Sequence, residues 1–139
     1  MTRALIYGGR DWRSLYDMTW RLNRLHRALK FTLVINGGQV SRDRDANELY
    51  GADWQAAVWA KTAGLPVLYF YANWQGEGKA AGPLRNQRMI DEGRPAVGIE
   101  FPGGRGTRDM RRRLEGSGIP VVRPVGMTPS ELDGCVIPA

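Results

Sequence analysis

The chain has 139 residues, of which 42% are hydrophobic and 24% charged, a length and composition that predict a single globular domain. No apolar run approaches the roughly 20 residues that a membrane helix needs, and the N-terminal MTRALIYGG reaches its glycines too early for a signal peptide. Cys135 is the single cysteine, so no intramolecular disulfide can form. These features exclude a membrane-spanning or disulfide-stapled protein and lead us to expect a cytoplasmic one.

The charge is basic, with 20 Lys and Arg against 14 Asp and Glu and a formal net charge of +6. This balance fits nucleotide phosphates, nucleic acid, or solubility alone. The run Arg111–Arg113 is a poor nucleic-acid patch because consecutive residues of a helix point in different directions. Charge therefore leaves these alternatives open.

The first predicted strand is Arg3–Tyr7, an apolar run that ends at Gly8 and Gly9. Asp11 can cap a helix that continues to about Lys30, because Leu and Met recur there at spacings of three and four residues. A strand, a glycine turn and a helix form the first half of an α/β unit.

The middle of the chain repeats this alternation. A second strand is predicted at Phe31–Ile35, and the polar segment Gln39–Tyr50 is expected to be an exposed excursion. Ala52–Ala63 is predicted to be a helix with an alanine-lined face, and Val67–Tyr71 is apolar throughout, which is typical of a strand covered on both faces. Ala72–Gly82 is expected to be a long loop.

The last part of the chain has the same order of elements. We predict a helix from Pro83 to Gly93, a strand from Ala96 into Pro102, a helix to about Glu115, a strand at Ile119–Val125, and a tail over residues 127–139 after a domain of residues 1–126.

Five strands alternating with four helices predict an α/β fold of the Rossmann-like type, a three-layer sandwich with a parallel sheet in the order 3-2-1-4-5 and helices on both faces. Ligands of such sheets bind at the carboxyl ends of the strands, where the strand order reverses. Here that point lies between the first and fourth strands. The segments Gly8–Asp11 and Pro102–Thr107 should therefore face one crevice.

The segment PGGRGT, Pro102–Thr107, has the pattern of a phosphate loop. Gly103, Gly104 and Gly106 have no Cβ, so the backbone N–H groups can approach a ligand closely. The amides of the helix that follows favour an anion. Thr107 can cap this helix and contact phosphate at once, and the structural alternative is that the glycines serve only a tight turn.

Four motifs carry a resemblance to a known family: GGRDW, GADWQAAVWA, AGPLRNQRM and PGGRGT. Together they resemble the SLOG superfamily of Rossmann-like domains, related to the LOG and Smf/DprA proteins, with the YspA-like branch as the best match. The resemblance covers about Ala4–Val122. It implies a bacterial or phage protein that binds a nucleotide or nucleotide-derived molecule and forms a homodimer or higher homo-oligomer.

The resemblance also bears on catalysis. In LOG enzymes an arginine of the preceding helix and a glutamate in PGG-x-GT-x-x-E serve N-glycosidic cleavage of nucleoside monophosphates. The arginine position is Arg85 here, but the glutamate position is Met110, whose thioether is neither an acid nor a base. Asp109 lies one residue earlier, about 100° round the helix, and is a candidate substitute. Asp11 and Glu100 are the other carboxylates that an enzyme here could use.

The function expected from these features is binding of a nucleotide-type ligand, such as an ADP-ribose derivative, by a sensor or sequestering protein. The alternatives are a LOG-related nucleoside-phosphate N-glycosidase and, less favoured, a nucleic-acid-binding protein. No catalytic triad or zinc-ligand spacing occurs, and no cofactor besides the nucleotide is implied. The predicted ligand-binding residues are Gly8, Gly9, Arg10, Asp11, Arg85, Asn86, Gly103, Gly104, Arg105, Gly106 and Thr107.

Two further side chains have competing interpretations. Arg10 can clamp a phosphate or form a weak surface pair with Asp11 or Asp53. Trp74, together with Tyr71, can stack on a nucleobase or pack into the core.

Overall fold

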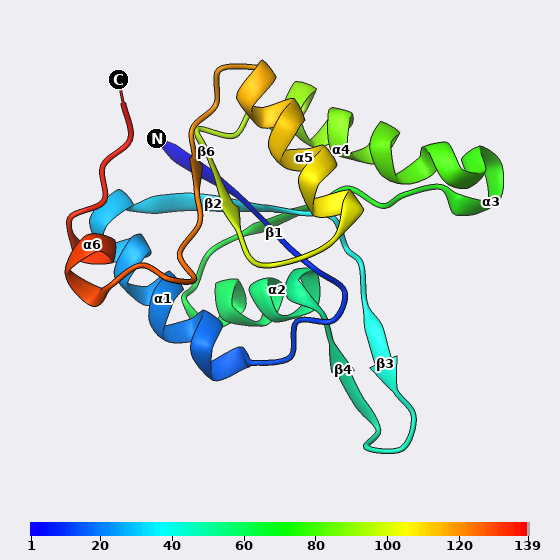
Figure 1. Cartoon of the computed structure of the whole chain (residues 1–139), viewed down its shortest axis with the longest axis horizontal. Coiled ribbons are helices and arrows are strands. Elements are labelled where there is room, and N and C mark those ends of the chain that lie inside the picture. Colours follow the sequence, from blue (N-terminus) through cyan, green and yellow to red (C-terminus); the bar gives the residue numbers. More distant parts are fainter. Residues whose placement is uncertain (139) are drawn as a thin grey trace.

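The computed structural model describes residues 1–138 and has five parallel strands at its centre (Figure 1). These strands are β1 (Thr2–Tyr7), β2 (Phe31–Asn36), β5 (Val67–Tyr69), β6 (Val97–Glu100) and β7 (Val121–Val122). They lie in the order β5-β2-β1-β6-β7. Numbered as the predicted strands, this is 3-2-1-4-5, so the predicted fold and strand order are confirmed.

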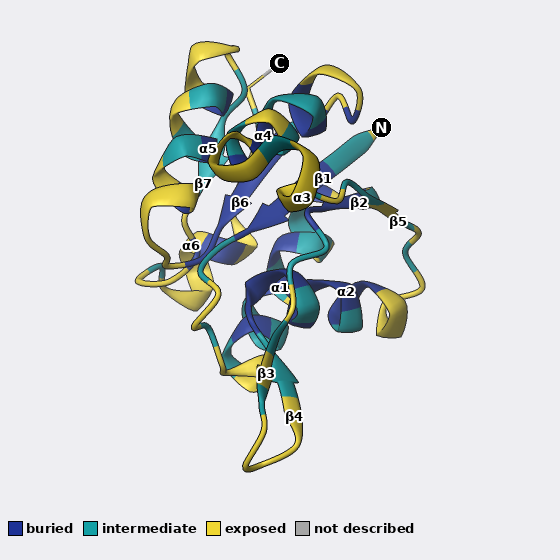
Figure 2. Cartoon of the chain, turned by 90° about the vertical axis from the view of Figure 1, so that its right-hand side faces the viewer, coloured by how far each residue is buried: buried dark blue, intermediate teal, exposed yellow. Residues whose placement is uncertain are grey.

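Helices cover both faces of the sheet (Figures 1 and 2). On one face lie α1 (Leu15–Leu29), α2 (Ala52–Thr62) and the short α6 (Pro129–Asp133), and on the other lie α4 (Ala81–Asp91) and α5 (Arg105–Gly116). Among the described residues, no helix combines the length and the apolar character needed to cross a membrane.

The alternating side chains of β1 divide the core into two parts. Ala4 and Ile6 belong to a buried cluster with the apolar side of α1 and α2, whereas Leu5 and Tyr7 belong to a second cluster with α4 and α5. This alternation follows from the two-residue period of a strand. It leaves the central strands β1, β2 and β6 mostly buried on both sides, as Figure 2 shows. The edge strand β5 is less buried, and Leu68 is 36% exposed, so the prediction that Val67–Tyr71 is covered on both faces is wrong.

The helix starts differ from those predicted. α1 begins at Leu15 with Ser14 as its N-cap, and the Ser14 hydroxyl accepts a hydrogen bond from the Asp17 amide at 3.1 Å. Asp11 is therefore not the cap. The reason is tertiary, because the segment before Ser14 bonds to the start of α2 instead: the Gly51 amide donates to the Trp12 carbonyl at 2.9 Å.

The prediction that Ala72–Gly82 is a long loop is also wrong, because this segment contains helical structure. A short α3 (Trp74–Glu77) is capped by the Asn73 side chain and is followed by a 3₁₀ turn, η1 (Gly78–Ala80). α4 then begins at Ala81, two residues before the proline predicted to open it. Pro83 is tolerated because the first amides of a helix have no partner in the helix.

The polar segment Gln39–Tyr50 forms a two-stranded hairpin, β3 (Ser41–Asp43) and β4 (Glu48–Tyr50). It extends away from the body of the molecule in Figures 1 and 2. Its turn is stabilised by the Asp43 carboxylate, which accepts hydrogen bonds from the amides of Asp45 and Ala46 at 3.1 Å. In the central sheet, the edge strand β7 is much shorter than the strand predicted at Ile119–Val125.

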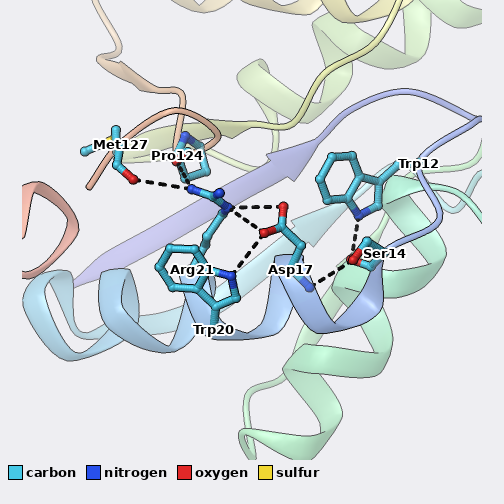
Figure 3. Close-up of polar contacts among 7 residues, drawn as sticks. All are labelled: Trp12, Ser14, Asp17, Trp20, Arg21, Pro124 and Met127. Carbon is cyan, nitrogen blue, oxygen red and sulfur yellow. Dashed lines mark hydrogen bonds and ion pairs between the residues drawn. The ribbon is translucent and has the colours of Figure 1, made fainter. Parts of the chain in front are cut away.

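The C-terminal residues pack back against α1. Figure 3 shows Arg21 bound to both carboxylate oxygens of Asp17 and donating to the carbonyl of Pro124 at 2.6 Å. Leu132 of α6 is fully buried in the cluster formed with α1, and Thr128 and Glu131 form a capping box at the start of α6. The segment predicted as a tail thus contains a core residue.

Replacing Leu132 with alanine should lower the free energy of unfolding by about 2–5 kcal/mol, because a fully buried leucine side chain is lost from the core. Val136 is 81% exposed, so Val136→Ala should stay within about 0.5 kcal/mol of the wild type. Chemical denaturation measures both. Equal effects of the two variants would show that α6 does not contribute to the stability of the core.

Candidate functional site

A cavity of about 800 Å³ opens at the carboxyl ends of the central strands. Its lining comes from the segments after β1 and β6 and from the starts of α2, α4 and α5. The cavity brings together all of the predicted ligand-binding residues: Gly8, Gly9, Arg10, Asp11, Arg85, Asn86, Gly103, Gly104, Arg105, Gly106 and Thr107.

The two glycine loops touch each other in the wall of this cavity. The Gly9 amide donates to the Pro102 carbonyl at 2.9 Å. A Cβ on Gly9 would lie 2.7 Å from that carbonyl oxygen, and a Cβ on Gly103 would lie 2.7 Å from the Gly9 nitrogen. Glycine is therefore required at both positions by the close approach of two backbones.

The N-terminus of α5 is open to the cavity. Its N-cap is Gly104, which has no side chain to cap the helix, and the first bond of the helix is from the Arg108 amide to the Gly104 carbonyl at 3.1 Å. The amides of Arg105, Gly106 and Thr107 precede that bond and are the anion-binding end of the helix. The suggestion that Thr107 caps α5 is wrong. Thr107 lies three residues after the N-cap Gly104, inside the first turn of the helix, and is buried.

Gly104 and Gly106 differ from Gly9 and Gly103 in their surroundings. A Cβ on either would meet no atom within 4 Å. The protein therefore leaves free space beside the amides that face the cavity.

Arg85 and Asn86 connect α4 to the surrounding loops. Arg85 donates from Nη1 to the Gly37 carbonyl at 2.6 Å, and the Asn86 amide nitrogen donates to Asp109 at 3.0 Å. Burial lowers the pKa of Arg85, opposed by the nearby charge of Asp53. Arg85 is thus a partly desolvated cation whose orientation is fixed by a backbone carbonyl.

Asp53 is a buried charged residue of the cavity that the sequence analysis did not include in the predicted site. It belongs to the first turn of α2 and is only 8% exposed, and its Oδ2 accepts a hydrogen bond from the Gln39 amide at 3.1 Å. Burial raises its pKa to about 6, although the Gln39 amide and the charges of Arg85 and Arg10 act in the opposite direction. The sequence signal was an acidic residue two positions after Gly51 at a helix start, GAD, which is also typical of an exposed first turn.

Arg10 and Trp74 form one side of the cavity. The Arg10 guanidinium lies 5.2 Å from the centre of the Trp74 ring, and Trp74 is 44% exposed. Neither of the weak pairs suggested for Arg10 is an ion pair in the structure as far as residues 1–138 show. Tyr71 stacks on Tyr69 and is not among the cavity residues, whereas Trp74 is; stacking of Trp74 on a base stays a prediction.

The carboxylates considered for catalysis have different environments. Burial opposes ionisation of Asp109, but hydrogen bonds from Arg113 at 2.8 Å and from Asn86 outweigh it and lower its pKa. Glu100 is outside the cavity lining and accepts a hydrogen bond from the Tyr7 hydroxyl at 2.9 Å. Met110 is 2% exposed and packs in the core beneath the cavity.

Cations outnumber carboxylates around the cavity. Within the described chain, no group of three or more His, Cys, Asp or Glu side chains is placed to hold a metal ion. The charged lining consists of Arg10, Lys79, Arg85, Arg105 and Arg112 on the positive side and Asp11, Asp53 and Asp109 on the negative side.

A comparison with known proteins finds one similarity over nearly the full length. The chain is 33% identical over 125 residues to the gene 61 protein of Mycobacterium phage D29, covering 88% of this chain and 95% of the phage protein. No protein-family model matches the chain. No solved structure matches it either.

The raised pKa of Asp53 predicts how stability depends on pH. Because the folded-state pKa is about 6 and the usual value is 3.8, the ionised carboxylate destabilises the folded state fully above about pH 6 and not below about pH 4. Asp53→Asn should therefore raise the free energy of unfolding by about 3 kcal/mol near pH 8, and the gain should vanish near pH 4. Urea denaturation at both pH values measures this, and an equal gain at both would contradict it.

Proposed function

Because the chain belongs to the family of the gene 61 protein of Mycobacterium phage D29, whose name states no activity, we propose from the site itself that it binds a nucleotide or nucleotide-derived ligand. A phosphate of that ligand occupies the N-terminus of α5. The observation that carries the proposal is the uncapped start of α5, which opens into a cavity of about 800 Å³ at the point where the strand order reverses.

Three properties of the cavity support a phosphate with an organic group attached. Its volume is in the range of small-molecule sites and far exceeds an inorganic phosphate. Arg10 and Arg105 add positive charge beside the open amides. Trp74, Trp12 and Met89 supply apolar and aromatic surface for a base or sugar. The resemblance of the motifs GGRDW, GADWQAAVWA, AGPLRNQRM and PGGRGT to the SLOG superfamily, and to its YspA-like branch, agrees with this proposal.

We assign the protein a binding role, as a sensor or sequestering protein for a nucleotide signal such as an ADP-ribose derivative. The position at which LOG enzymes carry their glutamate is occupied by the buried Met110. Asp109 is held by Arg113 and Asn86 in its ionised form and is a poor proton donor. Binding therefore has more support in the geometry than hydrolysis.

Nucleic-acid binding has the least support. Its basis is the net charge of +6. The cations that line the cavity are interleaved with Asp11, Asp53 and Asp109, an arrangement that suits one small ligand with donors and acceptors better than a continuous phosphate backbone.

Gly104 offers a direct test of the phosphate position. Neither Gly104→Ala nor Gly104→Asp meets another atom near the Cβ, and the φ angle of −101° is open to any residue. Titration calorimetry with AMP, ADP and ADP-ribose should find a ligand that binds more tightly than about 1 mM, or −4 kcal/mol. Gly104→Asp should weaken it by at least about tenfold through charge repulsion, and Gly104→Ala by far less.

The proposal fails if none of these ligands binds the wild-type protein in that range. It also fails if the alanine and aspartate variants bind equally well, because the charge would then lie away from the phosphate.

The hydrolase alternative has its own assay. Wild-type protein incubated with nucleoside monophosphates should release no free base, as followed by chromatography. Base release that is abolished by Asp109→Asn and retained by the exposed-site variant Asp91→Asn would establish the N-glycosidase instead.

A further inference from the structure

We propose that the Asp53 carboxylate accepts hydrogen bonds from the vicinal hydroxyls of a ribose, so that the site selects ribonucleotides over 2′-deoxyribonucleotides. This inference rests on the proposed nucleotide-binding function and assigns a second, sugar-binding end to the same cavity.

The position of Asp53 is set by the phosphate loop. The Ala52 amide donates to the Gly9 carbonyl at 3.0 Å, and the Gly9 amide donates to the Pro102 carbonyl at 2.9 Å. Gly9 thus joins the first turn of α2 to the loop that precedes α5. In a nucleotide the ribose is bonded to the phosphate. With the phosphate at the start of α5, the ribose therefore lies beside the neighbouring elements, and Asp53 at the start of α2 faces the sugar.

The chemistry of Asp53 matches a pair of hydroxyl donors. An ionised carboxylate offers about four acceptor sites. Among the described residues, the donor to this carboxylate is the Gln39 amide, which bonds to Oδ2. Asp53 lines the cavity and is only 8% exposed. A ribose diol donates two O–H groups, which satisfies a desolvated acceptor of this kind.

The charged neighbours of Asp53 favour the same ligand group. They are Arg85 from α4 and Arg10 from the segment after β1, and both favour the ionised form. A phosphate group placed beside the Asp53 carboxylate would bring two negatively charged hydrogen-bond acceptors together, and their repulsion excludes it. A base amine is a donor, but it lies a whole sugar further from the phosphate.

Asp53 also has a structural role, because its charge partly compensates the desolvated Arg85. An asparagine oxygen could accept the Gln39 hydrogen bond without the cost of desolvating a charge. Asp53 instead keeps a charge that burial disfavours, with its pKa raised to about 6. A ligand donor compensates that cost only in the bound state, which is typical of a residue kept for binding.

The test compares ADP with 2′-deoxy-ADP on the full chain by titration calorimetry, with inorganic pyrophosphate as a probe of the phosphate end alone. Wild-type protein should prefer ADP by at least about tenfold, because the deoxy compound leaves a buried acceptor without its donor. Asp53→Asn should lose that preference. Asp45→Asn, an exposed change in the hairpin turn with the same loss of charge, should keep the preference.

The outcomes separate this inference from the function on which it rests. If pyrophosphate and both nucleotides fail to bind the wild type, the proposed function itself is wrong. If they bind but ADP and 2′-deoxy-ADP bind the wild type equally, the ribose assignment alone is overturned. That second comparison needs no variant, so it decides the question even if Asp53→Asn fails to fold.

Discussion

The contact between Gly9 and Pro102 is the constraint on which the rest of the site depends. Its hydrogen bond of 2.9 Å draws the segments after β1 and β6 together at the place where the strand order reverses. The carbonyl of Gly9 then accepts from Ala52 and fixes the start of α2. One residue without a side chain therefore positions three elements around the same cavity.

The polar groups of the cavity are arranged at a cost to stability. The amides at the start of α5 have no capping side chain, Arg85 is partly desolvated, and Asp53 is a buried acid. A chain selected for stability alone would neutralise or cap these groups. We propose that a bound ligand compensates this cost.

The sheet could be predicted from the sequence because its causes are local. Apolar strands ended by glycine pairs, such as Arg3–Tyr7 before Gly8 and Gly9, specify both the strand and the turn, and the regular alternation of strands and helices specifies a parallel sheet. The cavity residues followed from the same reasoning, since parallel strands bring their carboxyl ends to one edge. Their roles in binding stay predictions.

The details that escaped prediction have tertiary causes. Ser14 replaces Asp11 as the cap because the intervening backbone bonds to α2. The hairpin β3–β4 is polar and short, so its pairing leaves no hydrophobic period to detect. Asp53 looked like an exposed helix-start acid, and only the approach of Gln39 and Arg85 around it shows that it is buried.

The glycines of the two loops are retained for different reasons, and this difference bears on how the family evolves. Gly9 and Gly103 are held by the backbones they touch, so selection on folding alone preserves them. Gly104 and Gly106 face open space, and folding would accept alanine at either. Among relatives of this chain, we therefore expect the first pair to follow the fold, whereas the second pair should follow the proposed ligand site.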